Sequence, residues 1–364
     1  MNSLVLIMLL FQISTIRSLP VVCYYILNQP DISLVPKHLC DTIILINSAH
    51  ISEDGELECF EDDLQQFAKL YDNKTNLFVS ITSPNPTFSY LTSSPDLMAT
   101  FAKDVTQMLK SYNLDGVDID WEFPVWSKNG KKTDRFQFSV FLKIMKTELQ
   151  SSDMKLSVAV SGPPTISRVA YDVEALSKYA DMVQIMNYDF HVFSKYKNPL
   201  VGFNAPLHRM RAEISVLGEM NSEASMNTWF ELGLPKNKSY FGIPTYARSY
   251  QLLTHYLHKP YSPATKSRPE LTNYEDVCIF AKDGYYTNVW NHNAQAPYLY
   301  GKDGLWISYE NERSILAKMA FARKYEVCGV MVFSIGSDDF NGECGYGKYP
   351  LLTKIANLAK ETED

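Results

Sequence analysis

The sequence predicts an α/β fold, a closed (β/α)8 TIM barrel with one inserted subdomain, and three observations carry this prediction. Short apolar, β-branched runs recur eight times along the chain, with helix-like stretches between them. The third to sixth and the eighth runs scarcely alternate, as expected of parallel strands buried on both faces. The turn at 28–31 lacks the glycine-rich phosphate loop of an open doubly wound sheet, so eight βα units imply a closed barrel.

Turn residues set the limits of the individual elements. The strands are expected at 21–27, 42–49, 77–82, 116–120, 155–161, 182–188, 240–244 and 329–334. Ser94, Pro95 and Asp96 supply an N-cap, a first-turn proline and an acidic first turn, which together predict a helix over 94–110. Helical periodicity predicts further helices at 135–149, 222–232, 311–324 and 351–360.

The interval between the seventh and eighth strands is far longer than one helix needs. Within it, residues 250–308 mix aromatic, polar and proline side chains without a helical period. We therefore expect an α+β insertion subdomain at 250–308 and a barrel built from 19–249 and 309–364.

The charge balance excludes some partners. Lys and Arg number 34 against 41 Asp and Glu, a net charge of −7. An acidic chain without a basic run is unsuited to nucleic acid or an anionic membrane, so neither is expected as a partner. Hydrophobic residues make up 46% and charged residues 21%, which is ordinary for a globular protein with a large core. We expect a monomer.

Residues 1–18 are expected to be a signal peptide. The run 4–13 is apolar except for Gln12 and is too short to span a bilayer, and Ser14, Thr15 and the small Ser18 follow it. The alternative is a first buried strand, because no basic residue precedes the run. A secreted, extracellular protein is predicted, and the glycosylation sequons at Asn73 and Asn237 fit that location.

Secretion would permit disulfide bonds between cysteines. Spacing alone leaves the pairing open and shows no CxxC motif, so a cysteine-based metal site is not expected. The six cysteines are Cys23, Cys40, Cys59, Cys278, Cys328 and Cys344.

Candidate catalytic residues concentrate at the end of the fourth strand. Asp118, Asp120 and Glu122 stand at alternate positions, so an extended strand points all three carboxyls to one side. The carboxyl ends of barrel strands form the catalytic face of this fold. Mutual repulsion and burial should raise at least one pKa, which would make a carboxylic acid able to donate a proton near neutral pH.

Two other interpretations of these acids were weighed. A calcium-binding loop needs a flexible turn with a glycine at its sixth position, whereas Ile119 and Trp121 favour a strand. A solvated acidic surface strand is disfavoured by the same apolar neighbours. Catalysis is therefore the preferred interpretation.

The segment from Asp115 to Glu122 resembles the Asp-x-x-Asp-x-Asp-x-Glu signature of family 18 glycoside hydrolases, the chitinases and chitinase-like lectins. The resemblance extends over the rest of the chain, at 22–24, 184–191, 242–249, 329–334 and 338–340. It implies a retaining mechanism in which the N-acetyl group of the sugar is the nucleophile, acting on β-1,4-linked N-acetylglucosamine in chitin or chito-oligosaccharides without a cofactor or metal.

The resemblance also assigns roles to single residues. It implies that Glu122 protonates the glycosidic oxygen, that Asp120 orients the acetamide and that Asp118 shares a proton with Asp120. Tyr188 would donate a hydrogen bond to the acetamide carbonyl. The implied substrate-binding residues are Asp115, Asp189, Met186, Tyr246, Arg248, Phe333 and Tyr24.

The disulfide pattern of the family carries over to four cysteines. It pairs Cys23 with Cys40 and Cys278 with Cys344, which leaves Cys59 and Cys328 unpaired. We expect Cys328 to be a buried free thiol.

Departures from the family pattern support a second hypothesis. The third strand usually ends in Ser-x-Gly-Gly-Trp, but 80–85 lacks both glycines and the aromatic. Phe333 replaces the usual tryptophan of the eighth strand, and none follows the first strand. The five tryptophans lie elsewhere, at Trp121, Trp126, Trp229, Trp290 and Trp306. Three lost platforms would weaken sugar binding about a hundredfold.

The first hypothesis is therefore a secreted chitinase-type hydrolase, and the alternative is a chitin- or glycan-binding lectin with little turnover. Because lectin-like members typically lose the glutamate, Glu122 favours the enzyme. We expect no chitin-binding module after Asp364, and hence action on soluble oligomers.

Overall fold

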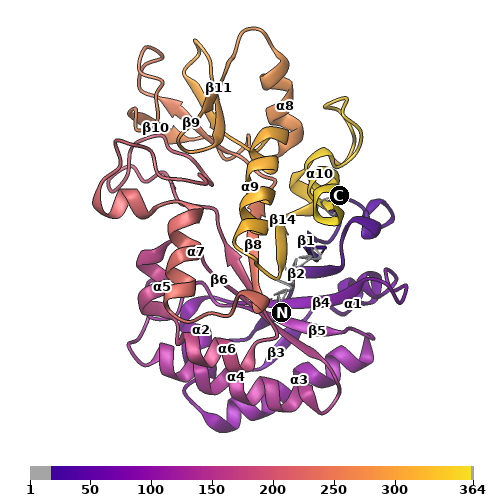
Figure 1. The fold of residues 1–364 in the computed structure, drawn as a ribbon. Coiled ribbons are helices and arrows are strands. Elements are labelled where there is room, and N and C mark those ends of the chain that lie inside the picture. The colour runs from indigo at the N-terminus through magenta and orange to yellow at the C-terminus, as the bar shows by residue number, and fades with distance from the viewer. Residues whose placement is uncertain (1–17, 362–364) are drawn as a thin grey trace, which may run out of the picture.

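The computed structural model describes residues 18–361. Nearly all of the predicted signal peptide therefore lies outside the described residues. Figure 1 shows a barrel with helices around it and a second, smaller sheet that projects from one end. None of the helices within 18–361 has the length and apolarity needed to cross a membrane.

Eight parallel strands of the described chain form the barrel. They follow one another in the order β1, β14, β8, β7, β6, β5, β4 and β2, and pairing between β1 and β2 closes the ring. This confirms the predicted TIM barrel. The strands are β1 (Val21–Ile26), β2 (Thr42–Ile51), β4 (Asn76–Thr82), β5 (Gly116–Asp120), β6 (Lys155–Ser161), β7 (Met182–Met186), β8 (Ser239–Pro244) and β14 (Gly329–Phe333). A short β3 (Leu57–Cys59) pairs antiparallel with the end of β2.

The helices lie outside the barrel, as Figure 1 shows. They are α1 (Glu61–Ala68), α2 (Asn85–Leu91), α3 (Pro95–Ser111), α4 (Asp134–Gln150), α5 (Pro164–Ala170), α6 (Val173–Tyr179), α7 (Ser222–Glu231), α9 (Glu312–Lys324) and α10 (Pro350–Lys360). Short 3-10 turns are η1 (Ile32–Leu34), η2 (Lys37–Leu39), η3 (Ser215–Glu219), η4 (Lys236–Lys238) and η5 (Ile335–Ser337). The predicted cap of α3 is present, since Ser94 accepts a hydrogen bond from the Leu97 N–H.

Three predicted strands end earlier than expected, at Ile26, Met186 and Phe333. After β7 the chain turns at Asp189, whose φ of 58° is left-handed and cannot continue a strand. After β1, Asn28 has a φ of 61° and stops the strand in the same way. Leu27 and Tyr188, which precede these turns, belong to loops that pack against the barrel.

The second sheet arises between β8 and α9. Its strand order is β10 (Ala264–Ser267), β9 (Arg248–Leu252), β13 (Leu305–Ser308), β12 (Ala296–Tyr300) and β11 (Thr287–Asn291). Helix α8 (Tyr274–Lys282) accompanies it (Figure 1). A separate apolar cluster that includes Phe203, Tyr250 and Trp306 forms its core. The sheet begins at Arg248, two residues before the range that the sequence suggested.

Two disulfide bonds are present, as the resemblance implied. Cys23 pairs with Cys40 and Cys278 pairs with Cys344. Cys59 and Cys328 are free. The expectation that Cys328 is buried was wrong, because this residue precedes β14 at the amino-terminal end of the barrel and is only partly covered. It donates a hydrogen bond to the Tyr240 hydroxyl at 3.6 Å.

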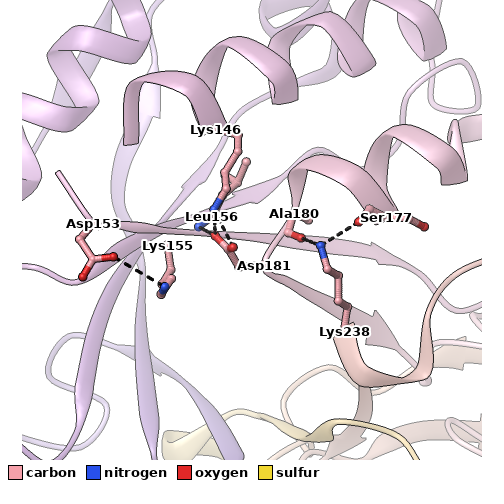
Figure 2. A network of polar contacts seen from close by, with 8 residues as sticks. All are labelled: Lys146, Asp153, Lys155, Leu156, Ser177, Ala180, Asp181 and Lys238. Atoms are coloured by element: carbon pink, nitrogen blue, oxygen red, sulfur yellow. Dashed lines mark hydrogen bonds and ion pairs between the residues drawn. The ribbon is translucent and has the colours of Figure 1, made fainter. Parts of the chain in front are cut away.

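Paired charges tie the amino-terminal ends of β6, β7 and β8 to the surrounding helices (Figure 2). Lys146 Nζ on α4 donates to both oxygens of Asp181, at 2.6 and 2.7 Å. Asp181 also accepts the Leu156 N–H at 2.8 Å. Lys238 Nζ donates to two carbonyl oxygens at the end of α6, which have no partner inside the helix.

Candidate active site

Alternation along β5 separates its polar and apolar side chains. Val117, Ile119 and Trp121 are fully buried in the layer between strands and helices. Trp121 stacks on Phe88 with ring centroids 4.9 Å apart. The three acids point to the opposite side of the strand, as predicted. Their exposure increases along the strand, because Asp118 is inaccessible, Asp120 is partly buried and Glu122 is exposed.

Asp118 lies deepest in the barrel. Its Oδ2 accepts hydrogen bonds from the hydroxyls of Tyr24, at 3.0 Å, and Ser80, at 2.8 Å. Burial raises the pKa of Asp118, although hydrogen bonds from Ser157, Ser80 and Tyr24 oppose the rise. Neutral donors hold this carboxyl, and within residues 18–361 it takes part in no ion pair.

Asp120 is less well supported than Asp118. Its Oδ1 is buried and finds no hydrogen-bond partner within the described part of the chain. Burial, and then the charges of Glu122 and Asp118, raise the pKa of Asp120 well above its ordinary value. An unpartnered buried oxygen is costly in a folded protein, so this atom is a natural acceptor for a polar group of a ligand or for a shared proton.

Glu122 stands at the open end of β5. It is exposed by surface area, yet enough protein surrounds its carboxyl that burial raises its pKa, and the charge of Asp189 raises the pKa further. The backbone on either side is fixed by Ser127, whose hydroxyl donates to the Glu122 carbonyl at 2.7 Å and accepts the Phe123 N–H at 2.6 Å. An accessible carboxyl that holds its proton is suited to general acid catalysis.

Aromatic side chains from β1 and β14 and from the loops that follow β7 and β8 gather beside the acids. The ring of Phe333 lies 5.5 Å from Tyr24, 5.8 Å from Tyr188 and 6.2 Å from Tyr246, between centroids. The Tyr188 hydroxyl donates to Met331 Sδ at 3.7 Å. Burial raises the pKa of Tyr188 well above its ordinary value, so its hydroxyl keeps its proton and remains a donor.

Asp189 gathers two polar partners next to this aromatic group. Its Oδ1 accepts from the Tyr246 hydroxyl at 2.5 Å and from Arg248 Nε at 2.7 Å. The Arg248 guanidinium also pairs with Oδ1 through Nη2 at 2.5 Å. The Asp189 N–H donates to Asn204 Oδ1 at 3.0 Å, which holds the residue in its left-handed conformation.

The structure thus brings most of the predicted site residues together, and Met186 joins them in the apolar cluster that contains Tyr24 and Tyr188. The structure corrects the prediction that Asp115 binds substrate. This residue precedes β5 at the amino-terminal end, about 16 Å along the strand from Asp120. There its Oδ2 accepts the Leu77 N–H at 2.8 Å, so its carboxylate caps a neighbouring strand instead of facing the site.

The end of β4 explains a departure noted in the sequence. The segment that lacks the family's glycines starts α2, and Asn85 Oδ1 accepts a hydrogen bond from Trp121 Nε1 at 2.6 Å. This polar contact between buried groups lies behind β5 rather than at the site. The side chain of Asn85 is therefore not available to a ligand.

Sequence reasoning missed one residue that shapes the site. Asn204 lies in a loop, and only its place in the fold brings it to Asp189. No motif or periodicity marked it. Ser80 was noted in the sequence, but its hydrogen bond to Asp118 follows from the register of β4 beside β5, in which the two residues are direct partners.

Among residues 18–361, no group of three or more His, Cys, Asp or Glu side chains is arranged to hold a metal ion. The site's chemical resources are therefore three acids with raised pKa values, the phenol donors and one arginine–carboxylate pair. This set can donate a proton and stabilise an adjacent positive charge.

A (β/α)8 barrel with paired acids at the carboxyl ends of its strands defines a class of barrel hydrolases. The family model for glycosyl hydrolases family 18 matches residues 20–338, and the chain belongs to this family. It is a chitinase or chitinase-like member.

Individual relatives are similar over most of the chain. The endochitinase of Brugia malayi is 29% identical over 91% of this chain and 69% of its own length. Mouse chitotriosidase-1 is 29% identical over 72% of this chain, which spans 59% of that protein. The solved structure of the Ostrinia furnacalis group IV chitinase has a TM-score of 0.86 and 26% identity, covering 94% of this chain and 100% of that one. It was also solved in complex with allosamidin, with a TM-score of 0.85, 26% identity and coverage of 93% and 98%.

Proposed function

We propose that this protein is a secreted chitinase-type glycoside hydrolase that cleaves β-1,4-linked N-acetylglucosamine chains by retaining, substrate-assisted catalysis. The observation that carries the proposal is the graded burial of Asp118, Asp120 and Glu122 on one side of β5. It leaves one protonated acid accessible and two supporting acids behind it.

In the proposed reaction Glu122 donates its proton to the glycosidic oxygen as the bond to the leaving sugar breaks. The acetamide oxygen of the sugar attacks its own anomeric carbon and forms an oxazolinium ion. Water then attacks that carbon, and the carboxylate of Glu122 accepts a proton from the water. The anomeric configuration is retained.

Asp120 supports this step through its unpartnered oxygen. Oδ1 would accept the acetamide N–H, and the negative charge of the carboxylate would stabilise the oxazolinium ion. Because Asp118 keeps only neutral donors around it, a proton is readily shared between Asp118 and Asp120. Tyr188 would donate to the acetamide oxygen, which offers a stronger acceptor than Met331 Sδ.

Phe333 and the tyrosines around it would form the floor under the reacting sugar, and Asp189, Tyr246 and Arg248 would hydrogen-bond its edge. The allosamidin complex of the similar Ostrinia furnacalis chitinase supports a sugar-like ligand for this kind of site. An uncharged glycan also suits this site, because its arginine, Arg248, is already paired with Asp189.

Several further features belong to the same proposal. Residues 1–18 would be a signal peptide, and 250–308 an insertion subdomain between the two parts of the barrel, 19–249 and 309–364. The sequon residues Asn73 and Asn237 are exposed and accessible to glycosylation. The proposed enzyme is a monomer that needs no cofactor.

The second candidate is a glycan-binding protein with little turnover. The observation that favours it is the end of β4, where α2 and the Asn85–Trp121 hydrogen bond replace an open glycine turn and its aromatic side chain. That change removes sugar contacts without touching the acids.

Comparing wild type with Glu122→Gln on a fluorogenic chito-oligosaccharide tests the proposal. Loss of the proton donor should lower kcat by about a thousandfold. Glu231→Gln is the matched control, because Glu231 is exposed at the end of α7 and should leave kcat unchanged. Binding of chitopentaose to both proteins without wild-type turnover would contradict the hydrolase and favour the glycan-binding protein.

A further inference from the structure

Trp126 differs from the other tryptophans in its exposure. Its side chain is 52% exposed, whereas Trp121, Trp229 and Trp306 are at most 1% exposed and Trp290 is partly buried. A single exposed apolar side chain is common on protein surfaces and alone means little. The position and the rigid support of Trp126 are what set it apart.

Trp126 lies in the loop that connects β5 to α4, at the same end of the barrel as Glu122. Ser127 bonds to the Glu122 carbonyl and to the Phe123 N–H, so the chain folds back on the proton donor. The Trp126 N–H donates to the Pro124 carbonyl at 2.7 Å, which completes a tight turn. The indole is therefore carried on the backbone that also carries Glu122.

A buried carboxylate holds the far side of this loop. Asp134 is inaccessible to solvent, and its Oδ2 accepts the N–H groups of Lys131, at 2.6 Å, and Val125, at 3.3 Å. The hydroxyl of Ser89 donates to its other oxygen at 2.8 Å. A Cβ on Gly130 would lie 2.5 Å from the Val125 carbonyl oxygen, so the two arms of the loop are in close contact.

The loop holds Val125 in a conformation that β-branched residues avoid. Its φ is 66°, in the left-handed region. Such strain persists only where the surroundings enforce it, and it clusters at functional sites. The hydrogen bonds to Asp134 and Ser127 enforce it here, and they fix the backbone from which the side chain of Trp126 projects. A rigid aromatic ring loses little entropy when it binds a ligand.

The strand order places Trp126 beyond the proton donor. In the barrel, β5 is four strands from β14, which carries Phe333, so the two lie on opposite sides of the ring. Glu122 directly precedes the β5 loop, so this loop leaves the barrel on the β5 side, across the ring from the strand that carries Phe333. If the reacting sugar rests on Phe333, as the proposed function requires, the glycan continues past Glu122 toward that loop. The part of the substrate past the donor is the leaving group.

We propose that Trp126 is a stacking platform for an N-acetylglucosamine unit on the leaving-group side of the scissile bond. The indole face would contact the C–H face of the sugar ring. This inference rests on the proposed function for the direction of the glycan. Trp126 would supply an aromatic contact from the β5 loop. The segment 80–85 at the end of β4 carries no aromatic residue, and its Asn85 is hydrogen-bonded to Trp121.

The test uses the Glu122→Gln protein, which binds substrate without consuming it. Calorimetric titration with chitopentaose is compared between Glu122→Gln and the double variant with Trp126→Ala. We expect the dissociation constant to rise about tenfold, as the loss of one aromatic contact implies. Trp126→Phe should recover part of the affinity. Tyr71→Ala is the matched control, because Tyr71 is 44% exposed and precedes β4 at the opposite end of the barrel.

Analysis of the cleavage products shows on which side of the scissile bond Trp126 acts. In the active protein, Trp126→Ala should shift chitopentaose cleavage toward products with fewer sugars on the leaving side. Unchanged chitopentaose affinity in the Trp126→Ala variant, or a changed oligomeric state with unchanged affinity, would overturn the platform while leaving the hydrolase intact. If neither the wild type nor Glu122→Gln binds or cleaves chitopentaose, the proposed function fails, and the platform fails with it.

Discussion

Acidic side chains lie at both ends of the barrel, and the two groups differ in what faces them. At the amino-terminal end, Asp181 binds Lys146 and the Leu156 N–H (Figure 2). At the carboxyl end, Asp118 is inaccessible and Asp120 is partly buried, and within residues 18–361 no cation pairs with either; hydroxyls bind Asp118, and Asp120 Oδ1 has no hydrogen-bond partner. The first arrangement stabilises a charge and joins secondary-structure elements. The second raises the pKa values of Asp120 and Glu122, which suits Glu122 to its proposed role as proton donor.

The difference shows that the identity of a residue does not decide its role in this fold. Asp115 and Asp120 lie on either end of the same short strand. Asp115 satisfies a backbone N–H of β4, whereas Asp120 keeps an oxygen without a partner. Substitutions at the two ends of the barrel should therefore separate catalysis from stability.

Asp120→Asn should have the largest effect on activity. Because the amide cannot stabilise the positive intermediate, kcat should fall by roughly a hundredfold to a thousandfold. The free energy of unfolding should stay the same or increase. Because the pKa of Asp120 is raised in the folded protein, the wild type becomes less stable as the pH rises toward that pKa, whereas a protein with an amide at this position does not. Oligosaccharide turnover and thermal unfolding near neutral pH measure both quantities. A stable variant with wild-type kcat would contradict the role of Asp120.

Tyr188→Phe should reduce kcat by about tenfold, as the loss of one hydrogen bond to the reacting acetamide implies. Stability should change little, because the hydroxyl gives up only its weak contact with Met331 Sδ, at 3.7 Å. Steady-state kinetics and chemical denaturation of the same preparation check both expectations. A large loss of stability with unchanged kcat would make Tyr188 a structural residue.

Asp181→Asn should show the opposite pattern. It removes the charge that binds Lys146, so the free energy of unfolding should fall by about 1 kcal/mol, with kcat unchanged. Asp153→Asn is the matched control at the same end of the barrel, because Asp153 is fully exposed and lies 4.0 Å from Lys155 (Figure 2). Equal stability of the two variants in urea would show that the Lys146–Asp181 pair adds nothing.

Asp189→Asn should have the smallest of these effects, which is a shift in the pH dependence of kcat. The charge of Asp189 raises the pKa of Glu122, so its removal should lower that pKa. The proton donor would then ionise at lower pH, and the alkaline fall in kcat would begin earlier. The position of this limb is the readout, because the weaker hydrogen bonds from Tyr246 and Arg248 to the amide oxygen change the rate equally at every pH. A limb that moves to higher pH would contradict the stated sign.

Much of the barrel could be predicted from local patterns. The strand predicted at 116–120 has these bounds in the structure, because Gly116 marks its beginning and the alternating acids mark its end. The strands predicted too long were so because the apolar residues Leu27 and Tyr188 continue the pattern past the strand end, up to the turn. That turn is set by backbone conformation, and an asparagine or aspartate in the left-handed region gives only a weak signal.

The site was predictable where one strand holds it and not where tertiary contacts build it. The acids of β5 follow from period-two alternation. The contact between Asn204 and Asp189 depends on the path of a loop, and the capping role of Asp115 depends on its neighbour β4. The rigid presentation of Trp126 likewise depends on Asp134 and Gly130, which no pattern in the sequence connects to it.

The pH dependence of kcat for the wild-type protein on a chito-oligosaccharide tests the central claim most directly. If Glu122 is the proton donor, kcat falls as pH rises through its raised pKa, and Glu122→Gln loses both the activity and that limb. A wild-type rate that is still rising above about pH 9 would contradict the account, because an ionised carboxylate cannot donate the proton.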